Sequence, residues 1–326
     1  MNKKELVTRN TEEVVTEEEL EEVLKKQKPV VYCGYETSGP VHIGTLVTVN
    51  KLLDFKKAGM HVKVLFADVH TRLNHKGSEE WILKMTEYWG ETFKALGLED
   101  AEYVLGSSFQ YEKDYMHDVL EVGVKTTMNR ALRSMQEVAR DIENAHVSQV
   151  IYPLMQAVDI KALDADIAYG GIEQRKIHML AREALPEIGY RKPLCVHTPL
   201  LCSLQGPESK MSSSQPDTLI SVEEDPESIK KKINSAYCPL EAGGNPVLDT
   251  CRLILFPMLG SLDVRRPEKY GGDVKYESYM SLEADYLSKK LHPQDLKNTV
   301  GLALSKVLEP VRGRLEGKGL KALEKE

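Results

Sequence analysis

Apolar residues along the chain gather in short runs that alternate with longer amphipathic stretches. Runs bounded by glycine, proline or polar residues predict strands at residues 30–35, 61–68, 101–106, 166–169 and 193–199. Apolar positions at helical spacing predict helices at residues 16–28, 46–57, 79–96, 115–143, 147–163 and 174–185. Because strands alternate with long helices, we expect an α/β fold with a doubly wound parallel sheet.

The pattern changes after residue 222. A helix is predicted at residues 227–236, and most of the sequence from there to residue 320 is helical in pattern. We therefore expect two domains. Residues 1–222 form a Rossmann-like α/β domain with inserted helices near 110–145, and residues 223–326 form a smaller, mostly α-helical domain.

Composition narrows the class of protein. The chain has 326 residues, 41% of them hydrophobic and 29% charged, which is typical of a globular protein. No apolar run approaches the roughly 18 residues of a membrane helix, and the first 15 residues lack the apolar core of a signal peptide. We therefore expect a cytoplasmic protein without a membrane partner. The five cysteines are scattered and lack CxxC spacing, so we expect them to be reduced.

Two loops carry candidate chemistry. The segment ETSGPVHIGT (36–45) follows the first predicted strand and leads into a helix, whose free N–H groups favour an anion. The segment GPESKMSSSQP (206–216) follows the last predicted strand and holds one lysine among hydroxyl donors. Taken alone, the first could be an ordinary strand-to-helix turn and the second a solvated linker.

The two loops together resemble the signature motifs of class I aminoacyl-tRNA synthetases, as HIGT and KMSSS. A closer resemblance, to tyrosyl-tRNA synthetases of the archaeal and eukaryotic type, runs from about residue 6 to residue 314. It rests on YCGYETSGPVHIGT, LFADVHTRLN, VIYPLMQAVDI, GGIEQRKIHMLARE and KMSSS, and in the C-terminal part on AYCP, RPEKYGGD and LHPQDLK.

The resemblance implies a first domain that activates L-tyrosine with ATP and a second domain that binds the anticodon of tRNA(Tyr). It implies Mg²⁺ accompanying ATP, no prosthetic group, and a homodimer. The implied catalytic residues are His42, Thr45, Lys210, Ser212 and Ser213. The implied ATP-binding residues are Gly34, Ser38, Gly44, Gly171 and Met211.

The resemblance also implies the substrate contacts. The tyrosine pocket would use Tyr32, Glu36, Leu65, Ala67, His70, Gln110, Tyr152, Gln156, Asp159 and Gln174. Within it, Tyr32 and Asp159 would contact the phenolic hydroxyl, and His70 would support the pocket by a hydrogen bond. The tRNA contacts would be Arg133, Arg175 and Lys176 near the acceptor end, and Cys238, Tyr270, His292 and Asp295 at the anticodon.

The spacing of three of these residues supports a common site. Tyr152, Gln156 and Asp159 fall at i, i+4 and i+7, so one face of a helix presents all three to one ligand. A tyrosine on such a face is more often part of a core. A buried carboxylate is harder to explain that way, because it is costly unless it is paired.

The sequence departs from the family pattern in three places. Thr45 stands where the first motif usually ends in histidine, Gln215-Pro216 stands where Lys-Gly commonly follows the serines, and Thr37 replaces a common proline. Thr45 can donate a hydrogen bond to a phosphate but lacks the reach of an imidazole. We therefore expect altered, rather than absent, activation of the amino acid.

Two alternatives stay open from the sequence. Tryptophanyl-tRNA synthetases share the fold and the motifs, although Asp159 opposite Tyr32 suits a hydroxyl better than an indole. The chain could also be a synthetase-like RNA-binding protein that no longer charges tRNA. A nucleotide-dependent redox role is remote, because no GxGxxG follows the first strand.

Overall fold

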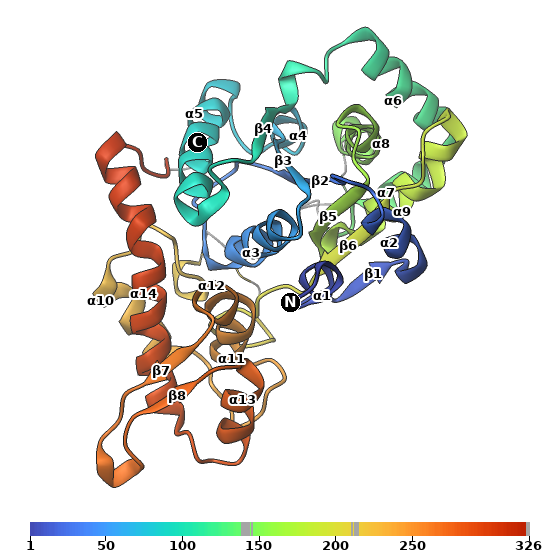
Figure 1. Ribbon diagram of the computed structural model, residues 1–326. Helices are drawn as coiled ribbons and strands as arrows, with labels where there is room; N and C mark the ends of the chain where they lie inside the picture. The colour runs from blue at the N-terminus through green and yellow to red at the C-terminus, as the bar shows by residue number, and fades with distance from the viewer. Residues whose placement is uncertain (138–143, 145, 210, 212–214, 324–326) are drawn as a thin grey trace.

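The computed structural model describes residues 1–137, 144, 146–209, 211 and 215–323. Within these residues, one sheet has the strand order β1-β6-β5-β2-β3-β4 (Figure 1). Its strands are β1 (Glu13–Val15), β2 (Val30–Tyr35), β3 (His61–Phe66), β4 (Glu102–Leu105), β5 (Ile167–Gly171) and β6 (Leu194–Thr198). Strands β2 to β6 pair in parallel, which confirms the predicted α/β fold.

Helices connect and cover these strands. They are α1 (Lys3–Thr8), α2 (Glu17–Leu24), α3 (Ile43–Lys57), α4 (Asp68–Leu73), α5 (Glu79–Phe93), α6 (Lys113–Lys125), α7 (Met128–Ser134), α8 (Val147–Ala162), α9 (Arg175–Ala184), α10 (Pro226–Ser235), α11 (Pro246–Thr250), α12 (Phe256–Leu259), α13 (Tyr279–Leu287) and α14 (Pro293–Lys318). No helix within the described residues is both long enough and apolar enough to span a membrane.

Several elements differ from the sequence-based expectation, and the short helices α1 and α4 were not predicted. Strand β1 was not predicted; it pairs antiparallel with β6, so the sheet is mixed rather than purely parallel. The helix expected at 115–143 is divided into α6 and α7 by a break at Thr126 and Thr127, and residues 138–143 lie outside the described part. The C-terminal part contains a short hairpin of β7 (Leu262–Val264) and β8 (Val274–Tyr276) among its helices.

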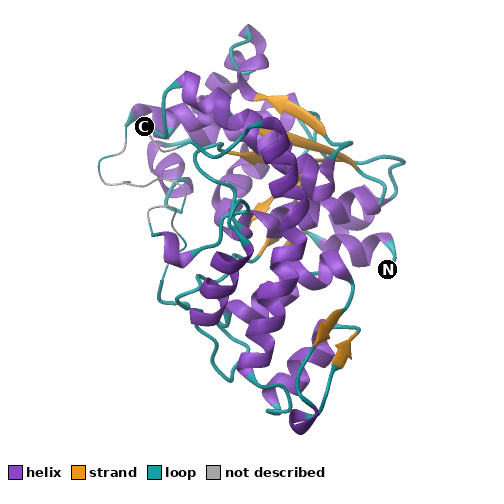
Figure 2. Ribbon diagram, turned by 90° about the vertical axis from the view of Figure 1, so that its left-hand side faces the viewer, coloured by secondary structure: helices purple, strands orange, loops and turns teal. Residues whose placement is uncertain are grey.

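The C-terminal helices pack directly on the α/β part. Figure 2 shows the main sheet toward one end of an elongated molecule and the β7–β8 hairpin toward the other. One buried apolar cluster continues from Val7 to Leu315 across both parts. Arg314 on α14 joins them by charge, because its Nε lies 2.7 Å from Glu91 and its Nη1 lies 2.9 Å from Glu99. A functional division after residue 222 stays a prediction.

The order of the strands fixes the place of the site. Strand β2 lies between β3 and β5, and the chain proceeds outward from β2 to β4 on one side and from β5 to β6 on the other. The carboxyl ends of β2 and β5 therefore flank the switch point of the sheet, where open α/β sheets form a ligand crevice.

A buried lysine attaches the N-terminal helix to α3. Lys51 is 2% exposed, and its Nζ donates to the main-chain oxygens of Leu6 at 3.0 Å and Val7 at 3.1 Å, and also to that of Arg9. Asp54, one turn further along α3, accepts from Arg9 Nε at 2.6 Å. Lys51 therefore supplies hydrogen bonds to the carbonyl oxygens at the end of α1, and Asp54 forms an ion pair with Arg9, which follows α1.

We predict that Lys51→Met lowers the free energy of unfolding by roughly 2–4 kcal/mol, because it leaves buried carbonyl oxygens without a donor. Urea unfolding followed by circular dichroism measures this change. The matched control is Lys57→Met, which removes an exposed lysine from the same helix. Equal stability of the two variants would show that Lys51 does not anchor α1.

Candidate active site

Two adjoining cavities open at the carboxyl ends of the parallel strands. The first has a volume of about 400 Å³ and the second about 580 Å³. Tyr35, His42, Glu173 and Met211 line both, so the cavities form one continuous crevice. A volume of this size suits a small molecule such as an amino acid next to a nucleotide.

The residues predicted for the tyrosine pocket converge on the first cavity. All of them line it except Gln110, which is fully buried behind it and contacts the lining residue Asp159. Gly34 and Ser38, predicted for ATP, line the same cavity. Gly44, Thr45 and Gly171 line the second cavity. Lys210, Ser212 and Ser213 lie outside the described residues.

Asp159 forms the polar end of the first cavity. It is 1% exposed, and its Oδ1 accepts from Gln110 Nε2 at 2.7 Å and from the Tyr115 hydroxyl at 2.8 Å. Its Oδ2 has no hydrogen-bond partner among the residues that the structure describes. Burial raises the pKa of Asp159 to about 7, although the two donors oppose this shift. One oxygen is therefore held by the protein and the other is left for a ligand.

His70 lies beside this carboxylate and is neutral. Burial lowers its pKa to about 3, and its ring meets that of Tyr152 edge-on at 4.6 Å. The amide Nε2 of Gln110 lies 3.3 Å from His70 Nδ1 and can only donate, so that ring nitrogen is the acceptor. The proton then sits on Nε2, 3.6 Å from Asp159 Oδ2. His70 is therefore oriented by Gln110 and turns a donor toward Asp159.

Tyr32, from β2, faces the same region of the cavity. The side chain is 1% exposed, and burial together with the Asp159 carboxylate raises the pKa of its hydroxyl well above its usual value. The phenol of Tyr32 therefore stays protonated and can both donate and accept a hydrogen bond.

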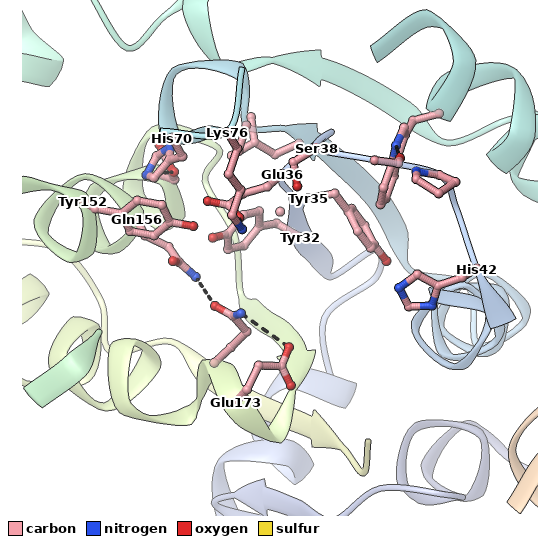
Figure 3. Close-up of a pocket in the computed structure, with 18 of the residues that line it drawn as sticks. Tyr32, Tyr35, Glu36, Ser38, His42, His70, Lys76, Tyr152, Gln156 and Glu173 are labelled. Atoms are coloured by element: carbon pink, nitrogen blue, oxygen red, sulfur yellow. Dashed lines mark hydrogen bonds and ion pairs between the residues drawn. The ribbon is translucent and has the colours of Figure 1, made fainter. Parts of the chain in front are cut away.

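Acceptor groups gather along another part of the cavity (Figure 3). Gln156 Nε2 donates to Gln174 Oε1 at 3.0 Å, and Gln174 Nε2 donates to Glu173 Oε1 at 3.4 Å. Within the described part of the chain, Gln156 Oε1 and Glu173 Oε2 are buried without a hydrogen-bond partner. Unpaired buried oxygens in a cavity suit a ligand that donates, such as an ammonium group.

Glu36 adds a carboxylate to these acceptors. Its Oε1 accepts from Asn74 Nδ2 at 3.0 Å, and its Oε2 pairs with the ammonium of Lys76. Lys76 points into the cavity beside Glu36 and Tyr152 (Figure 3). Burial and the Glu36 carboxylate raise the pKa of the Tyr152 hydroxyl well above its usual value, so this hydroxyl is also protonated.

Lys76, Glu173 and Tyr115 were not predicted from the sequence. Lys76 stands two residues after the quoted LFADVHTRLN run, and Glu173 stands inside the quoted GGIEQRKIH run, so the motifs themselves could have indicated both. Tyr115 contacts Asp159 from a helix 44 positions earlier in the sequence, and nothing in its own neighbourhood signals that contact.

His42 begins helix α3 at the boundary of the two cavities. Its Nδ1 accepts from the main-chain N–H of Gly44 at 3.1 Å, and burial lowers its pKa to about 4. The imidazole is therefore neutral with its proton on Nε2, which is available to an anion at the helix N-terminus. Gly44 must lack a side chain, because a Cβ there would lie 2.9 Å from the His42 ring.

The residues predicted for the acceptor end of tRNA gather on α7 and α9. Arg133 is exposed on α7, and Arg175 and Lys176 begin α9. Lys176 Nζ contacts Gln136 at 2.8 Å and Glu137 at 3.0 Å, just beyond the end of α7. Lys176 therefore joins the start of α9 to the segment after α7, whereas Arg133 Nε donates to Asn129 O on its own helix and Arg175 pairs with Glu13.

The residues predicted for the anticodon are more dispersed. Tyr270 is 61% exposed, with Lys269 Nζ 4.7 Å above its ring, and His292 caps α14 by accepting from Gln294 N at 3.1 Å. Cys238 Sγ lies 3.1 Å from the Tyr286 hydroxyl. Among the described residues, no hydrogen bond or ring contact joins Cys238, Tyr270, His292 and Asp295 to one another.

No group of three or more His, Cys, Asp or Glu side chains in the described ranges could hold a metal ion. Among the described residues, the carboxylates that line the first cavity are Glu36, Asp159 and Glu173, and they do not form such a group.

The comparisons with known proteins agree with this geometry. The family model of class I tRNA synthetases for tryptophan and tyrosine matches residues 24–309, so the chain belongs to that family. The tyrosine–tRNA ligase of Methanopyrus kandleri is 50% identical over 311 residues, covering 94% of this chain and 95% of its own length. That of Archaeoglobus fulgidus is 51% identical over 316 residues, covering 95% and 96%.

Solved structures of both kinds of synthetase share this fold. The tyrosyl-tRNA synthetase of Archaeoglobus fulgidus, complexed with L-tyrosine, matches with a TM-score of 0.93 and 50% identity, over 96% of this chain and 98% of that one. The tryptophanyl-tRNA synthetase of Aeropyrum pernix matches with a TM-score of 0.72 and 19% identity, which reflects a shared fold alone.

The raised pKa of Asp159 predicts a pH-dependent contribution to stability. Its ordinary pKa is 3.8 and its pKa in the fold is about 7, so between these values the folded state binds the extra proton. The contribution of Asp159 is therefore greatest at low pH and is lost as the pH rises toward 7, by up to about 1.4 kcal/mol per pH unit. Urea unfolding of the native chain and of Asp159→Asn, at several pH values from 4.5 to 7.5, measures it.

The two proteins should differ in the slope of unfolding free energy against pH, with the native chain losing more stability as the pH rises. His70 contributes the opposite slope, because its lowered pKa makes the fold bind fewer protons, but it is present in both proteins. Parallel slopes would contradict a raised pKa for Asp159.

Proposed function

We propose that this chain is a tyrosine–tRNA ligase that activates L-tyrosine with ATP and transfers it to tRNA(Tyr). The observation that carries the proposal is the buried Asp159 Oδ2, which has no partner in the described part of the chain and lies in a cavity that Tyr32 also lines. A phenol can satisfy that oxygen, whereas a phenylalanine ring would leave it unpaired. The relatives of about 50% identity, all named tyrosine–tRNA ligases, support the same substrate.

The two ends of tyrosine find different partners in this proposal. Tyr32 and Asp159 hold the phenolic hydroxyl, with Gln110, Tyr115 and His70 keeping Asp159 in place. The acceptors of Glu36, Tyr152, Gln156 and Gln174 hold the α-ammonium group, and Leu65 and Ala67 pack against the ring.

The reaction proceeds in two steps without a covalent enzyme intermediate. A carboxylate oxygen of tyrosine attacks the α-phosphorus of ATP, the bond to the β-phosphate breaks, and pyrophosphate leaves with its electron pair. A hydroxyl of the terminal ribose of tRNA then attacks the acyl carbon, and AMP leaves. The protein contributes by positioning both reactants and by stabilising charge.

The second cavity is the proposed site of ATP. His42 Nε2–H and Thr45 face the phosphates at the N-terminus of α3, and Gly34, Ser38, Gly44, Gly171 and Met211 shape the nucleotide site. Lys210, Ser212 and Ser213 would bind the phosphates from the KMSSS loop. Mg²⁺ would accompany ATP, with phosphate oxygens among its ligands.

The contacts with tRNA are also proposed. The basic side chains of Arg133, Arg175 and Lys176 beside the cavity suit the phosphates and bases of the acceptor end. Exposed Tyr270 suits stacking on an anticodon base, and Cys238, His292 and Asp295 would complete that contact. This assigns activation to residues 1–222 and anticodon binding to residues 223–326. The proposed location of such an enzyme is the cytoplasm.

A homodimer is also proposed. Leu120 and Val124 on α6, Met128 at the start of α7 and Val147 at the start of α8 are large apolar side chains that are 65%, 78%, 67% and 76% exposed. Large exposed apolar side chains suit a protein–protein interface, and a second copy of the chain would cover them.

ATP–pyrophosphate exchange with tyrosine, tryptophan and phenylalanine tests the proposed substrate. We expect exchange with tyrosine far above that with the other two. Tyr32→Phe and Asp159→Ala should each lower the preference for tyrosine over phenylalanine by roughly ten- to a hundredfold, because each removes one partner of the phenol.

Charging of a tyrosine tRNA completes that test. Tyrosine-dependent exchange without charging would leave a tyrosine-activating protein that is not a ligase. Absence of exchange with any amino acid, from a chain shown to be folded, would contradict the proposed enzyme.

Thr45 gives a separate test of the phosphate site. If its hydroxyl donates to a phosphate, Thr45→Val should lower the kcat of exchange by roughly tenfold or more with little change in the KM for tyrosine. Thr45→Ser keeps the hydroxyl and serves as the control. Thr45→His, which restores the usual histidine, should equal or exceed the native rate. Unchanged kcat in Thr45→Val would exclude the hydroxyl from catalysis.

A further inference from the structure

A series of polar side-chain contacts joins the edge strand β1 to strand β6 and helix α9. Glu13 on β1 pairs in register with His197 on β6. Its Oε1 lies 2.8 Å from His197 Nδ1 and 2.6 Å from Arg175 Nε. His197 Nε2 in turn lies 2.9 Å from Nδ1 of His178, which stands one turn after Arg175 on α9. The tyrosine pocket uses none of Glu13, His178 and His197.

Glu13 Oε1 and His197 Nδ1 lie 2.8 Å apart without a directional hydrogen bond among the described residues, so their contact is electrostatic. A carboxylate this close favours the proton on His197 Nδ1, and His197 Nε2 then accepts from His178 Nδ1–H at 2.9 Å. Burial lowers the pKa of both histidines, so the rings are neutral, and they stack with centroids 5.0 Å apart. Among the four side chains Glu13, Arg175, His178 and His197, only Glu13 and Arg175 therefore carry a formal charge.

The contact to Arg175 is short but not linear, so attraction between the charges, more than a directional hydrogen bond, holds it. It engages the Nε edge of the guanidinium, while the arginine side chain remains 46% exposed. A guanidinium carries five N–H donors, so the Nη groups can still serve an incoming acceptor. Glu13 itself is 25% exposed and approaches Arg175 from the sheet edge.

Arg175 lies between a residue of the tyrosine pocket and a residue that contacts the segment after α7. It directly follows Gln174, whose amide belongs to the tyrosine pocket, and it begins the helix whose next residue, Lys176, contacts the end of α7. The Arg175 side chain is 46% exposed, so it can contact a ligand beside Lys176 without entering the pocket. Its orientation is set by Glu13 on β1 rather than by the pocket residues.

We propose that Glu13 is a positioning residue for the tRNA step: it fixes Arg175 in the orientation that meets the acceptor end of the tRNA, with His197 and His178 holding Glu13 from behind. This inference rests on the proposed function, in which Arg175 contacts the acceptor end. Under this proposal, strand β1 contributes to the charging of tRNA as well as forming the edge of the sheet. The proposal also separates the residues required for charging from those required for activation.

Comparison of two activities tests this role. Glu13→Gln keeps the shape of the side chain and removes its charge. We expect it to lower kcat/KM for tRNA in charging by about tenfold, while tyrosine-dependent ATP–pyrophosphate exchange stays within about twofold of the native rate. Arg175→Ala should show the same split, and the double variant should be no worse than Arg175→Ala alone, because both changes remove one interaction.

The matched control is Glu12→Gln, which changes an exposed carboxylate at the neighbouring position whose main-chain N–H bonds His197 O. It should leave both activities unchanged. Glu13→Asp, with thermal unfolding of every variant, distinguishes lost position from lost fold, and it should recover part of the charging activity.

Three results would overturn the inference. A parallel loss of exchange and charging in Glu13→Gln would mean that Glu13 supports the whole site. A loss of charging in Arg175→Ala but not in Glu13→Gln would keep the tRNA role of Arg175 and remove that of Glu13. Normal charging by Arg175→Ala would show that Arg175 has no role in tRNA binding, and the inference about Glu13 would fail with it. The tyrosine pocket would be unaffected by that result, because the exchange assay tests it separately.

Discussion

A carboxylate buried in a protein interior must be hydrogen-bonded, and Asp159 imposes this condition on much of the surrounding structure. Two donors from the α/β part, Gln110 and Tyr115, converge on its Oδ1 from outside its own helix. Gln110 also fixes the tautomer of His70, which turns its Nε2 toward Oδ2. The cavity is consequently pre-organised around one oxygen that no described residue satisfies, and this oxygen is the basis of the proposed preference for a hydroxyl.

The topology of the sheet places the candidate phosphate site beside the cavity that contains Asp159. Because β2 and β5 are neighbours at the switch point, the loop after β2 and the Gly170–Gly171 end of β5 border one crevice. The loop after β2 enters α3 through His42, whose Nδ1 is occupied by Gly44 N–H and whose Nε2 carries the proton. The cavity proposed for the amino acid and the helix end proposed for the phosphates thus share lining residues, which suits the proposed attack of a carboxylate on a phosphate.

Much of this was predictable from local patterns. The five parallel strands and the long helices follow from runs and periods that a few neighbouring residues define, and the spacing of Tyr152, Gln156 and Asp159 correctly placed all three on one cavity. Strand β1 was missed because three residues carry too little pattern, and it is stabilised by pairing with β6, which lies far along the chain. Tyr115 was missed for the same reason, since its partner is 44 positions away.

The sequence by itself determined the class of fold, the family and the residue types of the site, because periodicity and motif spacing are local properties. Tertiary structure alone decided which oxygen of Asp159 is free, which nitrogen of His42 and His70 carries the proton, and that Glu13 meets Arg175. These features depend on directions and distances between side chains on different elements, together with the burial that shifts their pKa values. Pairings of that kind arise only when the chain has folded, because the partners are brought together by packing and not by their spacing in the sequence.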